Sequence, residues 1–476
     1  MKISIHNFKT IKDLVNLDIR PLNIISGANS SGKTSLIQFI LMLKQTIGFQ
    51  AVNRQLILNG NSIKLGCYNE VVYCKDTTND ISVEISFLGS ELNSSELDYL
   101  KITECRLEII FTSFEENAIL KSFQATYFTP SWARKEHWIN IKNNFDDTFS
   151  IQTNTAIFSS EIEQLCIENG GDPIVGELLF TSIMPQYFVS EIKNPNFPDI
   201  DKNPTKRASQ AIKLKRLDLL LQKTFSDISY IGPLREEPKN SYSANKNDKK
   251  IGNKGEYAAF IFEREATNKI DYFKIETDEK GIIKYIPCNG QLAEAVKYWI
   301  CDVFNLAKNI YAQEYKDEFV IKVVNHYGIE STIKHVGFGI SQILPIVLEG
   351  LRMEKGCTLI LEQPEIHLHP KVQGQLFDFL YSLTLLNKKF IIETHSDHFI
   401  TRMRRRVVED LSNILADKIN LLFIEQGDKE HVFIRLNMTD LGSLSYFPKD
   451  FADQIEVDYR AIVKAQAIKR QKKSDI

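Results

Sequence analysis

The chain has 476 residues, of which 25% are charged and 43% hydrophobic, and this ordinary composition predicts a globular protein with two domains or one large one. A formal net charge of -3 gives no global sign of a nucleic-acid-binding or membrane-surface protein, so any basic surface must be local. Seven cysteines without a C-x-x-C pair indicate reduced structural thiols in a cytoplasmic protein. The start, MKISIHNFKT, lacks the features of a signal peptide, and no apolar run is long enough to predict a membrane span.

The first 130 residues read as a strand, a glycine loop and a helix, followed by further strands. KISIHNF and LNIIS have strand patterns, and SLIQFILMLKQTI (35–47) has helical apolar spacing. Alternating or β-branched segments then fill residues 53–130. We therefore expect an N-terminal lobe over residues 1–130.

Between residues 131 and 330 the pattern changes, and we expect a mostly helical insert. Residues 210–225 and 291–307 are amphipathic in helical register, and residues 239–255, rich in Lys, Asn, Ser and Gly, predict a mobile loop. The insert is too short and too irregular for a long coiled-coil arm. A C-terminal lobe with alternating strands and helices is expected over residues 331–436, and a small tail over residues 437–476. Strands are expected in that lobe near 357–361, 389–393 and 419–425.

GANSSGKT, residues 27–34, fits the phosphate-loop pattern G-x-x-x-x-G-K-[ST] at every place, between a strand and a helix as the motif requires. The glycines let backbone N–H groups curl around a phosphate, and the helix that follows adds its positive end. Lys33 would place its charge on the β- and γ-phosphate oxygens, and Thr34 would offer its hydroxyl to Mg²⁺. The loop thus predicts ATP binding by Gly27, Asn29, Ser30, Ser31, Gly32, Lys33, Thr34 and Ser35.

Three further motifs follow in the C-terminal lobe. HVGFGISQILP (335–345) is a glycine turn that opens a helix, LILEQPE (359–365) is a strand that ends in carboxylates, and KFIIETHSD (389–397) is a strand that ends at a histidine. This order of motifs resembles the ABC-type ATPases, and among them the soluble branch of SMC, RecF and OLD-like proteins. The resemblance covers both lobes but not the insert. It implies an α/β fold, an ATPase head split by the insert.

In that family two heads enclose two nucleotides, and the glycine turn of one head faces the γ-phosphate held by the other. The resemblance therefore implies a homodimer or higher homo-oligomer, with Gly337, Gly339 and Ser341 in this role. If VGFGI is aligned with the usual L-S-G-G-Q, Gly337 takes the serine place and Ser341 lies one turn further on, so which of them meets the phosphate stays open. His395 corresponds to the histidine that reads the γ-phosphate, and Lys9 to a basic residue that touches nucleotide. The usual Q-loop glutamine has no assigned counterpart.

The acidic strand raises a question about hydrolysis. By resemblance, Glu362 takes the place of the carboxylate that holds Mg²⁺, and Gln363 takes the place of the base that activates water. An amide cannot accept the water proton at neutral pH, so this substitution predicts slow turnover and a long-lived ATP state. Glu365, which follows Pro364, is the other candidate base, and with it turnover would be ordinary. Both readings stay open.

Several longer phrases are similar to bacterial ATPases encoded in antiphage defence operons, such as the ATPase subunits of the Septu and PARIS systems and of some retrons. They are LNGNSIKLGCYNEVV (58–72), YIGPLREEPKNSY (230–242), EQPEIHLHP (362–370) and YFPKDFADQIEVDYRA (446–461). The resemblance implies a separate effector protein, a nuclease, as partner. No D-x-D follows His395, so no fused TOPRIM nuclease is expected. The alternatives are an ATP-locked scaffold with dispensable hydrolysis and a RecF-like DNA-repair clamp.

Two local patterns allow competing interpretations. RMRRRVVED (402–410) is either a solvated helix face or a site where DNA or RNA phosphates bind Arg402, Arg404, Arg405 and Arg406. His367 and His369 have no third metal ligand nearby, so a place at the dimer interface is favoured over a metal site. The basic, amphipathic end, residues 462–476, is a third such pattern, either a partner-binding helix or a frayed terminus.

Overall fold

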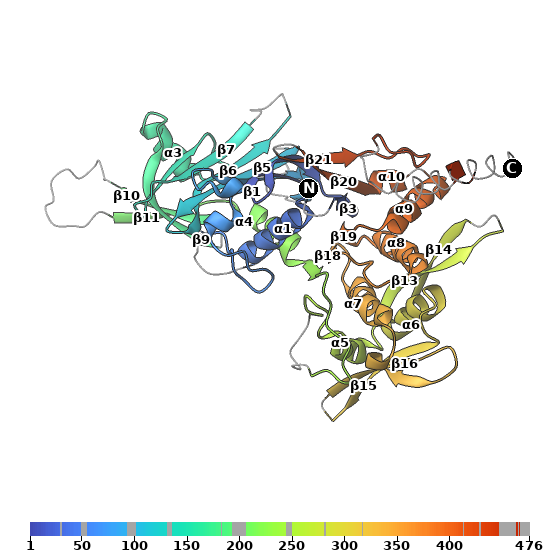
Figure 1. The fold of residues 1–476 in the computed structure, drawn as a ribbon. Helices are drawn as coiled ribbons and strands as arrows, with labels where there is room; N and C mark the ends of the chain where they lie inside the picture. The colour runs from blue at the N-terminus through green and yellow to red at the C-terminus, as the bar shows by residue number, and fades with distance from the viewer. Residues whose placement is uncertain are drawn as a thin grey trace, which may run out of the picture. The chain divides into compact units, whose positions relative to one another are not determined.

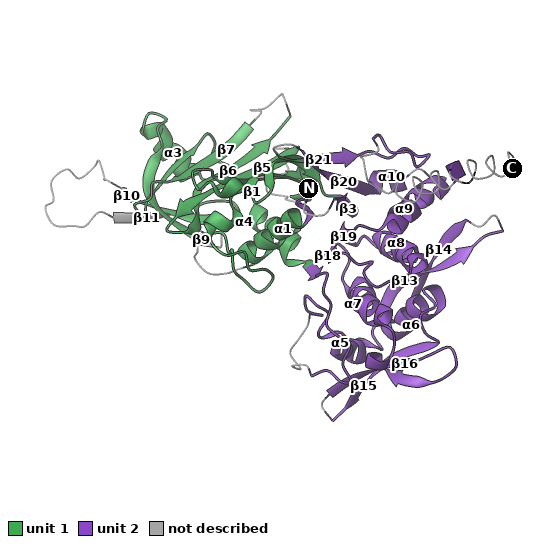
Figure 2. Cartoon of the chain, in the orientation of Figure 1, with its two compact units in different colours: residues 1–19, 34–228, 428–431 green, residues 20–33, 229–427, 432–476 purple. Residues whose placement is uncertain are grey.

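The computed structural model describes residues 1–28, 31–48, 55–92, 101–130, 136–181, 183–192, 206–243, 250–279, 282–316, 318–412, 414–427, 430–446, 463–464 and 466. The chain forms two compact units, coloured separately in Figure 2. Unit 1 comprises residues 1–19, 34–228 and 428–431, and unit 2 comprises residues 20–33, 229–427 and 432–476. These units are interleaved along the chain, whereas the sequence predicts four consecutive segments.

Unit 1 is built on a ten-stranded sheet with the order β11-β10-β9-β8-β7-β6-β5-β4-β1-β2. The strands are β1 (Lys2–Phe8), β2 (Ile11–Asp18), β4 (Ile81–Leu88), β5 (Glu104–Phe114), β6 (Asn117–Phe128), β7 (Glu136–Asn143), β8 (Phe149–Thr153), β9 (Ile174–Thr181), β10 (Met184–Ile192) and β11 (Lys206–Ala211). The helices are α1 (Lys33–Ile47), whose first residue belongs to unit 2, α2 (Tyr68–Val71), α3 (Ser160–Glu168) and α4 (Lys215–Ser226). The strands β4 to β6 confirm the β-rich reading of residues 53–130.

Unit 2 contains a six-stranded sheet with the order β12-β18-β19-β3-β20-β21 (Figure 1). Its strands are β12 (Ile228–Ile231), β3 (Leu22–Gly27), β18 (Thr358–Glu362), β19 (Lys389–Glu393), β20 (Ile419–Gln426) and β21 (His431–Leu436). The pairs β18–β19, β19–β3 and β3–β20 are parallel, so their carboxyl ends meet at one edge. Because β3 is buried along nearly its whole length, it reads as a continuous apolar strand, as expected for the centre of a parallel sheet.

The remaining elements of unit 2 flank this sheet or form smaller sheets. The helices are α5 (Ala258–Glu265), α6 (Leu292–Lys297), α7 (Phe338–Arg352), α8 (Pro370–Thr384), α9 (Asp397–Glu409) and α10 (Leu415–Lys418), with a π-helical turn, η4, over Tyr298–Val303. The hairpin is β13 (Lys269–Thr277) with β14 (Ile283–Gln291), and the three-stranded sheet is β15 (Asn309–Tyr315), β16 (Glu318–Val324) and β17 (Glu330–Thr332).

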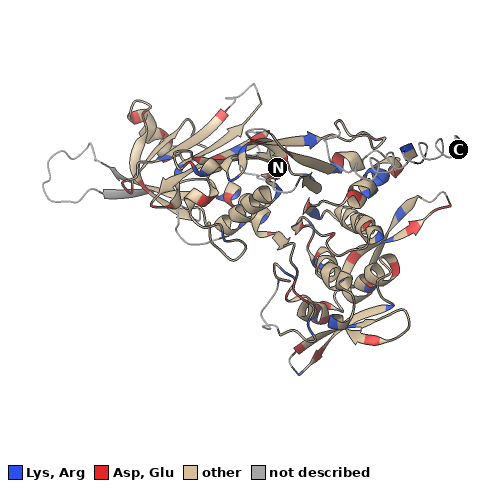
Figure 3. Ribbon diagram, in the orientation of Figure 1, with Lys and Arg blue, Asp and Glu red and all other residues tan. Residues whose placement is uncertain are grey.

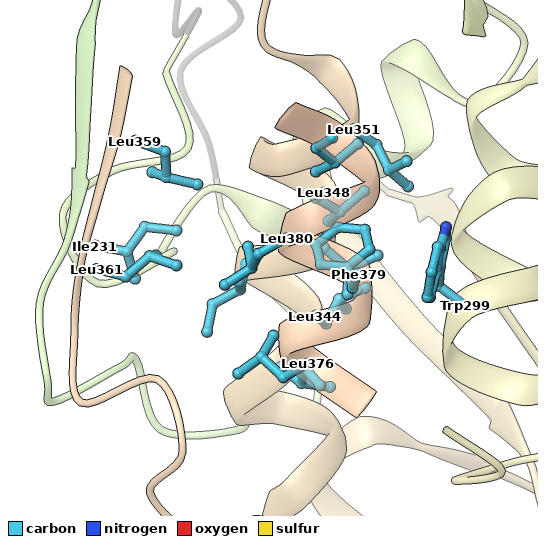
Figure 4. Packing of buried hydrophobic residues seen from close by; sticks show 14 of the residues in the cluster. Ile231, Trp299, Leu344, Leu348, Leu351, Leu359, Leu361, Leu376, Phe379 and Leu380 are labelled. Carbon is cyan, nitrogen blue, oxygen red and sulfur yellow. The ribbon is translucent and has the colours of Figure 1, made fainter. Parts of the chain in front are cut away.

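The core of unit 2 fixes α7 and α8 against the acidic strand β18. Figure 4 shows Leu359 and Leu361 of β18 on one side of the two helices and Trp299 on the other. Trp299 is fully buried and meets the ring of Phe379 on α8 edge-on, with the ring centroids 5.0 Å apart. A close-packed interior of this kind transmits displacement rather than absorbing it. The end of β18 is therefore anchored by the helices that pack on it.

The expectation of an α/β fold is confirmed, but the expectation of a mostly helical insert is wrong. Within the described part of residues 131–330, strands β7 to β16 predominate, and α4 and α6 with η4 account for the two amphipathic segments. Strands such as β13 expose side chains along both faces, so they lack the alternation that marks a half-buried strand. The expected mobile loop 239–255 lies partly outside the described residues, as does most of the expected tail. Among the described helices, none is long and apolar enough to cross a membrane.

Candidate functional site

The glycine loop joins β3 to α1, and its backbone requires both glycines. Gly27 has φ +150°, and a Cβ there would lie 2.3 Å from the carbonyl oxygen of Ile424 on β20. Gly32 has φ +90°, a conformation that residues with a side chain rarely adopt. The loop therefore has the curled backbone that a phosphate-binding motif needs. Asn29 and Ser30 lie outside the described residues.

Lys33 points back into this loop. Its ammonium donates to the carbonyl oxygens of Gly27 at 3.0 Å and Ala28 at 2.5 Å, and the residue is buried. Burial lowers the pKa of Lys33, and the carboxylate of Glu393 acts in the opposite direction. Ser31, also fully buried, lies within 3.5 Å of the same ammonium. A phosphate in the loop would compete with the two carbonyls for the charge of Lys33.

The first turn of α1 and the β1–β2 turn meet within unit 1. The hydroxyl of Thr10 donates to Ser35 Oγ at 2.9 Å, and the ammonium of Lys9 donates to Gln38 Oε1 at 2.7 Å. Lys9 has φ +49°, and partial burial lowers its pKa. Its charge is thus directed at the helix that follows the glycine loop, and the structure gives its ammonium a protein acceptor.

The acidic strand ends in a buried carboxylate that has a second carboxylate beside it. Glu362, the last residue of β18, pairs in register with Glu393, the last residue of β19, and both are buried. The phenol of Tyr230 donates to Glu362 Oε1 at 3.0 Å. Burial and the nearby charge of Glu393 raise the pKa of Glu362 to about 7. A cation would relieve this repulsion, so the site suits Mg²⁺, which prefers carboxylate and hydroxyl oxygens.

The residue after Glu362 has an unusual backbone that other groups hold in place. Gln363 has φ +44°, a left-handed conformation that costs roughly 1–3 kcal/mol for a residue with a side chain. Its backbone N–H donates to the backbone carbonyl of Glu393 at 2.8 Å. The guanidinium of Arg235 donates to the carbonyl oxygens of Gln363 at 3.0 Å and Glu362 at 3.1 Å. Backbone strain of this kind persists where the surrounding structure enforces it, and it occurs most often at functional sites.

Glu365 is held beside the histidine that ends the next strand. Its Oε1 accepts a hydrogen bond from the backbone N–H of His395 at 2.7 Å. Its Oε2 is buried and has no donor within hydrogen-bonding distance among the described residues. Burial raises the pKa of Glu365, and the pKa of His395 is lowered by desolvation and by the charge of Lys33. The structure thus gathers Lys33, Glu362, Glu365 and His395 around the carboxyl ends of the parallel strands.

Three functional residues here were missed by the sequence reasoning: Tyr230, Arg235 and Glu393. Glu393 stands inside the quoted phrase KFIIETHSD, directly before Thr394 and His395, and its strand-end position equals that of Glu362. Arg235 and Tyr230 stand in YIGPLREEP, which carried only a family resemblance. An arginine after a short strand and a Gly-Pro pair is a weak signal, because two of its three acceptors, Glu362 and Gln363, lie 127 and 128 positions away in the sequence.

The glycine turn begins α7, and its two glycines have no structural need to be glycine. Gly337 has φ -58°, and a Cβ there would meet no atom within 4 Å. A Cβ on Gly339 would meet nothing closer than 3.7 Å. Ser341, in contrast, is buried and donates its hydroxyl to the carbonyl of Phe338 at 2.8 Å. Of the two candidates for a phosphate contact, this geometry favours Gly337 over Ser341.

The histidine pair after the acidic strand lies beside the first residue of α7 and at the start of α8. No group of three or more His, Cys, Asp or Glu side chains that could hold a metal ion occurs among the described residues. His369 caps α8, with Nδ1 accepting from the backbone N–H of Lys371 at 3.3 Å, and the ring of His367 lies 5.9 Å from that of Phe338. Phe338 itself is 58% exposed. The interface reading of this pair stays a prediction.

The arginines of the basic run bind within the chain, and a nucleic-acid contact of this run stays a prediction. The run lies on α9, and Figure 3 draws its arginines blue. Arg402 and Arg406 both bind the buried carboxylate of Asp378 at 2.6 Å, and the side chain of Arg406 is only 3% exposed. Arg405 pairs with a glutamate one turn further along the helix, and Arg404 donates to a backbone carbonyl. These charges hold α8 and α9 together.

Comparisons with known proteins give a family match and several structural similarities. A family model described as an AAA ATPase domain matches residues 1–400. The SMC head domain from Thermotoga maritima is similar with a TM-score of 0.36 and 10% identity, over 91% of this chain and 97% of that chain. The Smc head domain with an extended coiled coil bound to the C-terminal domain of ScpA, from Pyrococcus furiosus, gives a TM-score of 0.38 and 11% identity, over 92% and 96%. A search of curated proteins found no match.

Proposed function

The chain belongs to the AAA ATPase domain family, whose model spans residues 1–400, and from this premise we propose that it binds ATP with Mg²⁺, hydrolyses it slowly and acts as a nucleotide-gated switch. The observation that carries the proposal is the gathering of a phosphate-loop lysine, two buried strand-end carboxylates and a histidine, with an amide side chain in the place of the usual base. Such a site binds nucleotide well but lacks the usual general base, so it hydrolyses ATP slowly.

Each residue has a role that its chemistry supports. Lys33 binds the β- and γ-phosphate oxygens, and His395 reads the γ-phosphate. Thr34 and Glu362 are the residues that would hold Mg²⁺, which when bound neutralises phosphate charge. Gln363 orients water by hydrogen bonding but cannot take its proton. Glu365 is the alternative base. One of its oxygens accepts from the backbone N–H of His395, and the other has no donor within hydrogen-bonding distance among the described residues.

The glycine turn supports a nucleotide-bridged homodimer or higher homo-oligomer. A glycine inside a helix costs roughly 0.5–1 kcal/mol relative to alanine, and the packing of Gly339 in the first turn of α7 does not explain it, since a Cβ there would meet nothing closer than 3.7 Å. A surface where no Cβ intervenes lets a phosphate approach backbone N–H groups at a helix start. We assign this surface to the nucleotide held by a second copy. Since a ligand shared by two heads favours the closed state, slow hydrolysis would prolong it.

The partner that recognises the ATP-bound form is proposed to be a separate effector protein, a nuclease, in cytoplasmic antiphage defence. The support is the sequence resemblance to defence ATPases together with the composition of the site. An ATP-locked scaffold with dispensable hydrolysis would have the same phosphate loop and differs only in its need for turnover. A RecF-like DNA-repair clamp has less support, because Arg402 and Arg406 are both paired with Asp378 within the chain.

Two variants test nucleotide binding and assembly. Lys33→Ala should abolish ATP binding in calorimetric titration, while Lys355→Ala, which removes a 63%-exposed lysine elsewhere in unit 2, should leave it unchanged. Equal ATP affinity of both variants and the wild type would refute the phosphate-loop role. Gly337→Val should keep the melting temperature, since the site is open, but abolish ATP-dependent self-association in analytical ultracentrifugation. Wild-type protein that stays monomeric with ATP and Mg²⁺ would refute the shared site.

A further inference from the structure

The loop after β12 places a buried arginine behind the turn that follows the acidic strand. Arg235 is 6% exposed and donates to three carbonyl oxygens: its own loop's Pro233 at 3.0 Å, Glu362 at 3.1 Å and Gln363 at 3.0 Å. The last two acceptors are consecutive backbone groups at the end of β18. Nη1 and Nη2 therefore bind neighbouring carbonyls, which a planar guanidinium does well and an ammonium does poorly.

We infer that Arg235 is a positioning residue for ATP hydrolysis, acting through the backbone of Glu362 and Gln363; this inference rests on the proposed ATPase function. Three hydrogen bonds hold the backbone of Gln363. Its N–H donates to the carbonyl of Glu393 on β19, and its carbonyl accepts from Arg235 at 3.0 Å and from the N–H of Ile366 at 3.3 Å. The bond to Glu393 comes from the sheet and the bond from Ile366 from the turn itself, whereas Arg235 comes from a loop outside both. Removal of Arg235 leaves the left-handed φ of Gln363 with the sheet bond and the longer bond within the turn.

The consequence reaches the three side chains that this turn carries toward the nucleotide. Glu362 precedes the strained residue, Gln363 is that residue, and Glu365 lies two positions further on. If the φ of Gln363 relaxes, the direction of all three side chains changes, because each follows the backbone path of the turn. A displacement of about 1 Å at a catalytic group can cost on the order of 10²-fold in rate.

Charge supports the same assignment. Glu362, Glu365 and Glu393 are three buried carboxylates, and Arg235 is a buried cation whose charge acts on two of them. The pKa of Arg235 is lowered to about 10 by burial, so its guanidinium stays protonated at neutral pH. Arg235→Lys keeps the cation and loses the paired donors, whereas Arg235→Gln loses both. The two variants thus separate charge from geometry.

All of the hydrogen bonds that Arg235 makes in the described structure go to backbone carbonyls, and none goes to the glycine loop. Lys33 and the loop that binds the phosphates are held by separate contacts, to Gly27 and Ala28. Loss of Arg235 should therefore lower kcat while the affinity for ATP stays unchanged. A residue needed only for folding would lower the fraction of active protein and the melting temperature together.

The test is steady-state ATPase kinetics with Mg²⁺ on the full chain. Arg235→Gln and Arg235→Lys should each lower kcat by about 10²-fold with unchanged KM and unchanged calorimetric ATP affinity. The matched control is Arg352→Gln, which removes a partly buried arginine of unit 2, one bound to Glu265 and Glu349 and not to the turn. It should leave kcat unchanged. Melting temperatures are measured for all variants, and Arg235→Lys, which keeps the charge, carries the test if Arg235→Gln does not fold.

Three outcomes would overturn the inference. Unchanged kcat in folded Arg235→Lys and Arg235→Gln refutes the positioning role alone, provided that the wild type turns over ATP. An equal loss of kcat in Arg352→Gln shows a general effect of unit 2 stability and also refutes it. Absence of ATP turnover by the wild type, with or without a partner, overturns the proposed hydrolysis and the role of Arg235 with it.

Discussion

Replacement of Gln363 by glutamate tests whether the amide is what slows the enzyme. A positioned general base contributes about 10²–10⁴-fold, which corresponds to roughly 2.7–5.5 kcal/mol at about 1.36 kcal/mol for each factor of ten. Because Gln363 is held by Glu393 on one side and Arg235 on the other, a residue of the same length should keep the turn. Gln363→Glu should therefore raise ATP turnover, toward the lower end of that range.

The expected gain in turnover lies near the lower end of the range because other carboxylates already surround position 363. Glu362 has a pKa of about 7, raised by burial and by Glu393, and a new carboxylate beside them would also have a raised pKa. A base must be deprotonated to act, so the gain in turnover should be smallest at low pH and should grow as the pH rises. The positive charge of Arg235 lowers the pKa of Glu362 and so limits the rise.

The assay is phosphate release at saturating ATP for the wild type, Gln363→Glu, Glu365→Gln and Glu362→Ala over a range of pH. Glu362→Ala should remove Mg²⁺-dependent hydrolysis, which checks that the measured activity belongs to this site. If Glu365→Gln alone stops turnover and Gln363→Glu changes nothing, the base is Glu365. The argument for a slow switch would then lose its main support.

Three further predictions concern the rest of the molecule. Asp378→Ala should lower the free energy of unfolding by about 3–5 kcal/mol, because Arg402 and the buried Arg406 lose their shared carboxylate and Arg406 keeps only Glu409, whereas Arg405→Ala, at an exposed arginine, should cost less than about 1 kcal/mol in urea denaturation. Burial lowers the pKa of Lys388 to about 8, so above that pH the unfolded chain keeps the proton on this ammonium while the native chain loses it. Between about pH 8 and pH 9.5 the free energy of unfolding of the wild type should therefore rise by roughly 2 kcal/mol relative to Lys388→Met. A difference between the two proteins that stays constant over this range would contradict the prediction. The purified chain should not cleave DNA or RNA with Mg²⁺ unless a second protein is added, and cleavage that a point mutant of this chain abolishes would disprove it.

The parts of the site that depend on nearby residues were predictable from the sequence. The glycine loop needs only a strand, two glycines and a helix in succession, and the predicted helix over 35–47 corresponds to α1. The strands expected near 357–361, 389–393 and 419–425 correspond to β18, β19 and β20. Each is a short apolar run bounded by polar residues, which is how a buried parallel strand reads.

The parts that depend on distant pairing were not predictable in the same way. Glu393 becomes a partner of Glu362 only because β18 and β19 pair in parallel and in register, which no spacing in the sequence states. Arg235 acts on carbonyls, which every residue has, so its acceptors leave no mark in the sequence. The arginines of α9 looked like a free basic surface because their partner, Asp378, lies on another helix.

The central position of β3 determines when the site can form during synthesis and refolding. β3 lies between β19 and β20, so Asn23 donates its side-chain amide to the carbonyl of Phe390, 367 residues later in the chain. A ribosome would have to extend the chain past residue 426 before this strand has both neighbours. Contacts of such long sequence separation form slowly, because loop closure must come first. Until then the glycine loop has no sheet to hold it, and nascent chains should reach nucleotide-binding competence only late in translation.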